Sequence, residues 1–213
     1  MTAVASKRRS TCAGLFVGLL PVLLAGCGAS LLPKPPAALA RFTLDDTTAI
    51  TTSRAPAASA PVLMVAVPRA ASGYDSVHMV YQRDPHELAA FAFNEWVDTP
   101  ARMLAPLLVR SLQGSGSFRA VLLAPSAASA SLRLETELIR LVQDFSVRPS
   151  QLRLTLHAVL LDSATRRVIA WREFDESVPA PTDDPAGGAA AAHQATRQML
   201  AGLAAFCAQQ VGR

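Results

Sequence analysis

The chain has little of what enzymes, metal proteins and disulfide-bonded domains require. Its 213 residues include only three cysteines, and 17% of them are charged. No CxxC pair, HExxH motif, GxSxG motif or phosphate-binding glycine loop occurs, which excludes the commonest zinc, thiol-redox, hydrolase and nucleotide-binding motifs. The hydrophobic fraction of 51% is nevertheless too high for a disordered chain. It is enough for one domain with a sizeable core.

The net charge of +4 comes mostly from the N-terminus. Lys7, Arg8 and Arg9 precede every acidic residue, and they are the only charged residues among the first 26. Without residues 1–26 the chain has 17 basic side chains against 16 acidic ones. Binding to nucleic acid requires a basic patch, so we exclude a nucleic-acid partner.

Residues 1–26 have the pattern of a secretory signal peptide. The basic residues 7–9 precede an apolar run over 12–24, which is shorter than the roughly 20 residues that a membrane-spanning helix needs. The run ends in Leu-Ala-Gly-Cys at residues 24–27, which resembles the lipobox of bacterial lipoproteins. We therefore expect removal of residues 1–26 and acylation of Cys27, including a palmitate-type chain. An ordinary signal peptide, or an uncleaved anchor with an incidental Cys27, is the alternative.

The segment around Cys27 also predicts the location. Two or more acyl chains anchor a protein stably, whereas one chain does not. Gly28 follows the cysteine, where lipoproteins retained at the inner membrane usually have Asp, so we expect the outer membrane and a domain that faces the periplasm. Residues 27–39 are rich in proline and small residues, which predicts an extended tether. The 12 residues after the cysteine would reach roughly 35 Å.

Few side chains after the tether point to chemistry. None of the four histidines has a partner at metal-ligand spacing, so we expect no catalytic residue, metal or cofactor. Cys207 lies among apolar residues and is predicted to be a buried, inert thiol, with a reactive or intermolecular role as the alternative. Trp96 and Trp171 are predicted as core residues, with a role as binding anchors as the alternative. The pairs Asp45–Asp46 and Asp183–Asp184 are predicted as solvated turns, with catalytic or calcium-binding use as the alternative, and His86–Glu87 is an unpromising acid/base pair.

Residues 40–213 predict a single α+β domain, in which two helices pack on one face of a mostly antiparallel sheet. Asp98 or Thr99 can cap a helix that has Pro100 in its first turn and ends at Gly114–Gly116. A second, alanine-rich helix is predicted over 189–211. Strands are predicted over 41–44, 61–68, 77–82, 87–93, 118–123, 132–141, 151–160 and 168–174, and a loop over 47–60. The alternation of polar and apolar residues slips at 139–141, which predicts a β-bulge.

The stretch SVHMVYQRDPHELAAFAFNEWVDTPARMLAPLLVRSL, followed by GSGSFRAVL, resembles the ABC-type transport auxiliary lipoproteins. This family includes the third component of the paraquat-inducible membrane-transport operon. The matching features are Tyr81 near a strand end, the aromatic strand with Phe91 and Phe93, then Trp96 and Pro100 before a leucine-rich helix. These motifs are structural, so the resemblance assigns no catalytic or cofactor-binding residue.

The resemblance implies a role beside an MCE-domain transporter, which has an ATPase, a permease and a substrate-binding MCE protein and moves phospholipids or other hydrophobic molecules. These proteins are the expected partners, and self-association is a further expectation. One alternative is a structural accessory lipoprotein for the assembly of outer-membrane barrels or lipopolysaccharide. A lipid-anchored hydrolase is the other, and the absence of a nucleophile–base motif argues against it.

Overall fold

The structure is a computed structural model that describes residues 38–45 and 56–211. The predicted signal peptide, Cys27, most of the predicted tether and most of the loop expected over 47–60 lie outside these residues. The described part forms a single α+β domain whose core is one continuous apolar cluster.

Nine strands and two helices make up the described part, and they alternate along the chain in blocks. The order is β1 (Ala40–Phe42), β2 (Val62–Val65), β3 (Arg69–Ala70), β4 (His78–Gln82), β5 (Leu88–Trp96), α1 (Pro100–Gly114), β6 (Ala120–Leu123), β7 (Leu132–Asp144), β8 (Gln151–Asp162), β9 (Val168–Pro179) and α2 (Pro185–Val211). The short strand β3 was not predicted, and β9 continues five residues past its predicted end at 174. Phe118, predicted in a strand, lies just before β6 and is fully buried.

Three long antiparallel strands, β7, β8 and β9, form the frame of the sheet. Along them, apolar side chains alternate with polar ones, so that one face is buried and the other is open to solvent. The register between β7 and β8 shifts between Leu138 and Arg140, which confirms the predicted bulge. The bulge brings Leu141 onto the buried face after the break, where it joins the core.

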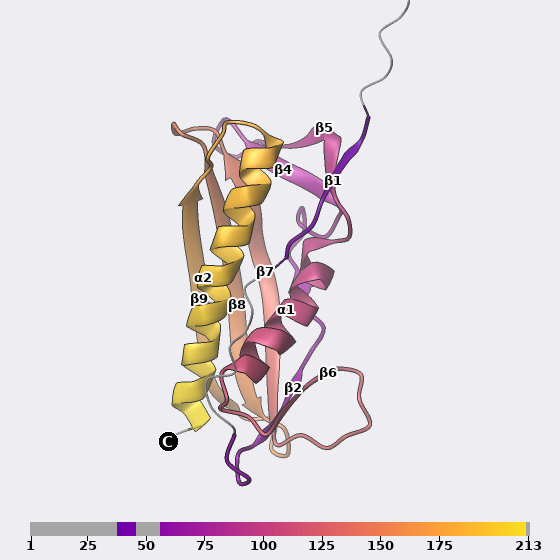
Figure 1. Cartoon of the computed structure of the whole chain (residues 1–213), viewed down its shortest axis with the longest axis vertical. Helices are drawn as coiled ribbons and strands as arrows, with labels where there is room; N and C mark the ends of the chain where they lie inside the picture. The colour runs from indigo at the N-terminus through magenta and orange to yellow at the C-terminus, as the bar shows by residue number, and fades with distance from the viewer. Residues whose placement is uncertain (1–37, 46–55, 212–213) are drawn as a thin grey trace, which may run out of the picture. The chain divides into compact units, whose positions relative to one another are not determined.

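The free edge of β7 is shared by three short strands. β2 pairs with the start of β7, β3 with its middle and β4 with its end, each in parallel. β6 extends the sheet beyond β2, while β5 and β1 extend it beyond β4 (Figure 1). The sheet is therefore mixed, although its long ladders are antiparallel, as the sequence predicted.

Both helices cover the same face of the sheet (Figure 1). α2 packs on β8 and β9, and α1 lies beside α2 over β2, β6 and β7. Thr99 occupies the N-cap position of α1, but its side chain makes no capping hydrogen bond. Instead the Asp98 carboxylate accepts a hydrogen bond from the Thr99 N–H at 2.8 Å and pairs with Arg102 at 3.2 Å.

α2 begins at Pro185, four residues before its predicted start, because Asp184 caps it. The Asp184 carboxylate accepts a hydrogen bond from the Gly187 N–H at 2.8 Å, and proline is well tolerated in a first turn. Glycine is required at 187, since a Cβ there would overlap the Thr182 carbonyl oxygen. The Gln143 amide then fastens this end of α2 to the sheet by donating to the Asp184 carbonyl oxygen at 3.1 Å.

Candidate binding face

The side of β7, β8 and β9 that faces away from the helices is called the uncovered face here. Its residues alternate with core residues along each strand and lie opposite one another in the register. One row across the strands is Arg133–Leu161, the next is Glu135–Val159–Trp171, and the third is Glu137–His157–Glu173. No helix covers this face in the described part of the chain.

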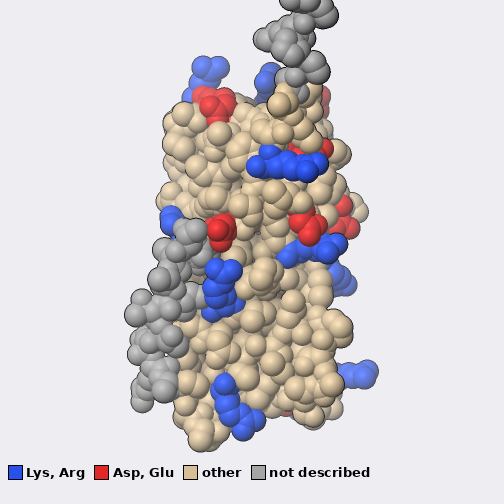
Figure 2. Space-filling model, turned by 45° about the vertical axis from the view of Figure 1, so that its right-hand side comes forward, with Lys and Arg blue, Asp and Glu red and all other residues tan. Residues whose placement is uncertain are grey.

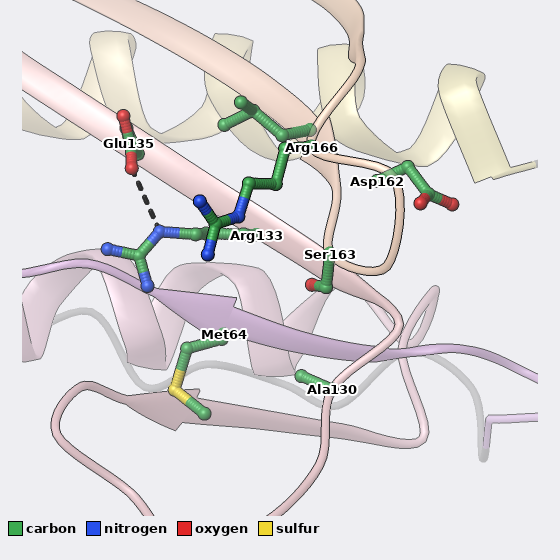
Figure 3. Close-up of a pocket in the computed structure, with 8 residues that line it drawn as sticks. Met64, Ala130, Arg133, Glu135, Asp162, Ser163 and Arg166 are labelled. Atoms are coloured by element: carbon green, nitrogen blue, oxygen red, sulfur yellow. Dashed lines mark hydrogen bonds and ion pairs between the residues drawn. The ribbon is translucent and has the colours of Figure 1, made fainter.

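A hollow of about 500 Å³ lies at one end of the uncovered face, near the turn between β8 and β9. Met64 of β2, which lies opposite Arg133, and Leu161 of β8 give it an apolar lining. Charged side chains stand around this lining (Figure 3). The full set of lining residues is Met64, Ala130, Arg133, Glu135, Leu161, Asp162, Ser163 and Arg166.

Two arginines and two carboxylates line the hollow, but only one ion pair forms between them. The Nε of Arg133 donates to Glu135 at 2.9 Å, and this contact leaves both terminal nitrogens of Arg133 outside the pair. Arg166 extends from its turn toward Arg133 (Figure 3). Asp162 points away from both arginines. The two guanidinium groups therefore share one side of the hollow with a single opposing carboxylate.

Asp162 is occupied by the turn itself. Its Oδ1 accepts hydrogen bonds from the Thr165 N–H at 2.7 Å and the Thr165 hydroxyl at 2.8 Å. These bonds, the backbone one foremost, hold the pKa of Asp162 below its usual value. Arg166 has a positive φ of 59°, and its N–H donates to the Asp162 carbonyl oxygen at 2.9 Å. These hydrogen bonds thus fix the backbone of Arg166 beside the hollow.

An apolar strip extends from the hollow toward β9. It consists of Met64, Leu161, Val159 and Trp171. Trp171 is 66% exposed, so its prediction as a core residue was wrong. Its ring lies 5.8 Å from that of His157, its neighbour on the uncovered face. The strand alternation already assigns Trp171 to this face, because Ala170 and Phe174 face the helices.

The other predicted candidates have structural roles. Trp96 is buried in the core with 3% exposure, as predicted. Cys207 is fully buried, and burial raises the pKa of its thiol to about 12, which confirms the buried thiol. Asp183 and Asp184 are exposed in the bend before α2, as predicted; in addition the Asp183 carboxylate accepts the Ser150 N–H at 2.7 Å, and Asp184 caps α2. Asp46 lies outside the described residues.

The histidines are separated from one another. His86 lies in the turn between β4 and β5 with φ of 70°, and both His86 and Glu87 precede β5, so they are not neighbours within a strand. His78 lies 3.9 Å from Glu95, and His193 of α2 donates to the Thr43 carbonyl oxygen at 2.6 Å. Among residues 38–45 and 56–211, no three His, Cys, Asp or Glu side chains come together as a metal site would require.

The surface carries no large basic region on the side drawn in Figure 2, where acidic and basic side chains alternate with broad uncharged areas. Every basic residue after Lys34 is an arginine. The guanidinium group suits carboxylate and phosphate partners because it donates in a planar fork. Within the described residues, no helix has the length and apolar character to cross a membrane.

The described residues form a small α+β domain with one mixed sheet and two helices on one of its faces. Residues 42–204 match the family model of the ABC-type transport auxiliary lipoprotein component. The chain belongs to this family, which confirms the resemblance seen in the sequence. Membership makes it an auxiliary component of ABC-type transport and implies a non-catalytic role.

Solved structures share the fold. A protein from Xanthomonas campestris is 26% identical, with 82% of this chain and 96% of that chain covered and a TM-score of 0.67. An uncharacterized protein is 13% identical, with 80% of this chain and 99% of that chain covered and a TM-score of 0.63. A PelC dodecamer from Paraburkholderia phytofirmans reaches 14% identity, 70% and 92% coverage and a TM-score of 0.42, which is too low to support an argument. No curated protein matches the sequence.

Sequence reasoning did not single out the hollow. The alternation did assign Arg133 and Glu135 to the solvent side of β7. The sequence holds no signal that Arg166 would join them, since the turn that positions it depends on the Asp162–Thr165 hydrogen bonds and on a left-handed backbone.

Proposed function

We propose that the chain is an outer-membrane lipoprotein that faces the periplasm and serves an MCE-type ABC transporter. The transporter moves phospholipid or other hydrophobic substrates between the membranes. Residues 1–26 are the signal peptide, Cys27 carries the acyl chains, residues 27–39 are the tether, and 40–213 form the auxiliary domain. The partners are the MCE-domain protein with its permease and ATPase.

One observation carries the proposal: a lipobox-like Leu-Ala-Gly-Cys at 24–27 precedes the family match over 42–204 in the same chain. The leader supplies the anchor, and the family supplies the transport role. Neither is sufficient by itself, because many lipoproteins share such a leader and a fold alone does not determine a function.

The geometry of the domain supports a role between two membranes. The described chain begins at the end of the domain where β4 and β5 lie (Figure 1). The hollow lies at the other end of β7, beside Arg133, whereas β4 pairs with Gln143 and Asp144. Ten residues of strand separate these ends, or roughly 33 Å. The first described residues and the hollow therefore lie at opposite ends of β7.

Crosslinking of the tagged protein in its own cells, followed by mass spectrometry, tests the partnership. We expect to recover an MCE-domain protein together with its permease or ATPase. Recovery of barrel-assembly or lipopolysaccharide components in their place would contradict the transport role and favour an assembly accessory. A tagged lipoprotein of unrelated fold at the same membrane is the control for nonspecific crosslinking to abundant neighbours.

The anchor is tested by a pair of cysteine variants. Cys27→Ala should release the protein from the membrane fraction, because acylation at this thiol is the proposed attachment. Cys207→Ala is the matched control and should remain membrane-bound, since this thiol is buried in the core. A Cys27→Ala protein that stays with salt-washed membranes would contradict the proposed anchor.

A further inference from the structure

We propose that the hollow between Arg133 and Arg166 binds the anionic headgroup of a lipid, whose acyl chain lies along the apolar strip of Met64, Leu161, Val159 and Trp171. The shared chemistry is a phosphate or carboxylate group attached to an apolar chain. The proposal rests on the transport function in one respect only, the choice of a lipid as the source of that anion.

The charges of the hollow favour an anion. Glu135 engages only the Nε of Arg133, and Asp162 is held by Thr165 on the far side of the turn. Arg166 faces the hollow and forms no ion pair with another described residue. A phosphate or carboxylate between the two guanidinium groups would accept charge-assisted hydrogen bonds from both and relieve the repulsion between them.

The surroundings of this anion site favour an amphiphile over a free ion. The floor of the hollow is apolar, and the volume of about 500 Å³ lies within the usual range for a small-molecule site. From this floor the strip leads to Trp171, a large side chain that is 66% exposed. Val168 and Ile169 of the same strand are exposed as well, and a group of exposed large apolar side chains commonly marks a contact surface. A free phosphate would make no use of the strip.

Isothermal titration calorimetry on the full-length protein in a nonionic detergent tests the proposal. The probes are dihexanoyl-phosphatidylglycerol, dihexanoylglycerol and inorganic phosphate. We expect the phosphatidylglycerol to bind at least tenfold more tightly than either other probe, because only this probe combines the anion with the chains. Equal binding of inorganic phosphate would show a free-anion site and overturn the lipid, and equal binding of dihexanoylglycerol would overturn the headgroup role.

Three variants test the residues. Arg166→Gln should weaken binding roughly tenfold, which is the usual effect of losing a hydrogen bond to a charged group. Glu135→Gln should strengthen binding several-fold, because it removes the competing carboxylate from Arg133 but keeps a hydrogen-bond acceptor. Arg102→Gln, an exposed arginine of α1 on the other side of the sheet, is the matched control and should bind as the wild type does.

A gain of affinity in Glu135→Gln is a result that loss of structure cannot produce. Indistinguishable affinities for Arg166→Gln and Arg102→Gln would overturn the assignment of the site, as would the absence of binding by all three probes. The titration needs no partner protein. A failure here with an MCE-domain protein recovered by crosslinking would therefore refute the lipid site and leave the transport role in place.

Discussion

The two faces of the sheet formed by β7, β8 and β9 differ sharply in the types of residue that they carry. On the helix-covered face, β8 presents Leu152, Leu154, Leu156, Ala158 and Leu160, all buried. On the uncovered face, the alternate positions hold a mixture of arginine, carboxylate, histidine and aromatic side chains. Strand alternation alone separates the two sets. The covered face is specified by volume and apolarity, and the uncovered face is free to carry binding chemistry.

The two tryptophans provide the largest test of this comparison. Trp96→Ala should lower the free energy of unfolding by about 3–5 kcal/mol, because it leaves a cavity in the core. Trp171→Ala should change it by no more than about 0.5 kcal/mol, as is usual for an exposed position. Urea unfolding followed by circular dichroism measures both values.

One outcome of the tryptophan experiment would contradict the difference between the two faces. A Trp171→Ala variant that loses as much stability as Trp96→Ala would mean that the uncovered face is part of the folding core. The comparison of faces would then fail. The lipid titration supplies the complementary readout, since Trp171→Ala should weaken the binding of dihexanoyl-phosphatidylglycerol even though the fold is unchanged.

Sequence reasoning succeeded on the covered face. The leucines of β7 and β8, the bulge near Leu138 and the buried stripe of α2 all follow from periodicity. These features depend on local patterns, which a sequence displays directly. The aromatic cluster of Tyr81 and Phe91, whose ring centroids lie 4.6 Å apart, also follows from two adjacent predicted strands.

Sequence reasoning was weaker where structure depends on distant partners. The parallel pairing of β2, β3 and β4 with β7 brings together segments some 60 to 70 residues apart, and no local pattern encodes it. The early start of α2 was missed because glycine at 187 and 188 argues against a helix by propensity. The structure needs glycine at 187, where a Cβ would overlap the Thr182 backbone, while a Cβ at Gly188 would force the end of the Gln143 side chain to shift.

Replacing Gly187 tests how closely the first turn of α2 must pack against the segment that precedes it. Gly187→Ala should lower the free energy of unfolding by about 1–3 kcal/mol, because its Cβ would overlap the backbone oxygen of Thr182. Gly202→Ala is the control in the same helix. Its Cβ would lie 3.4 Å from the Phe174 ring, and the gain in helix propensity of up to about 1 kcal/mol should offset the tight contact. Thermal melting compares the two, and equal destabilisation would contradict a specific requirement at 187.

The smallest change in stability is expected at Asp184, the N-cap of α2. Asp184→Ala should cost about 1 kcal/mol at pH 7, because the Gly187 N–H loses its acceptor. Asp184→Asn keeps an acceptor oxygen but lacks the charge, so it should cost less than Asp184→Ala without being neutral. Neither variant should alter lipid binding at the uncovered face, which separates the fastening of the helix from the proposed site.

The pH dependence of this cap has a definite sign. The hydrogen bond from the Gly187 N–H, followed by that from the Thr182 hydroxyl, holds the pKa of Asp184 below its ordinary value. The capping contribution is therefore present above the unfolded-state pKa of about 3.9 and is lost as the pH falls through the folded-state pKa. Melting curves at pH 7 and pH 3 should show the gap between wild type and Asp184→Ala narrowing in acid. A gap that is constant with pH would mean that the charge of Asp184 contributes nothing to the cap.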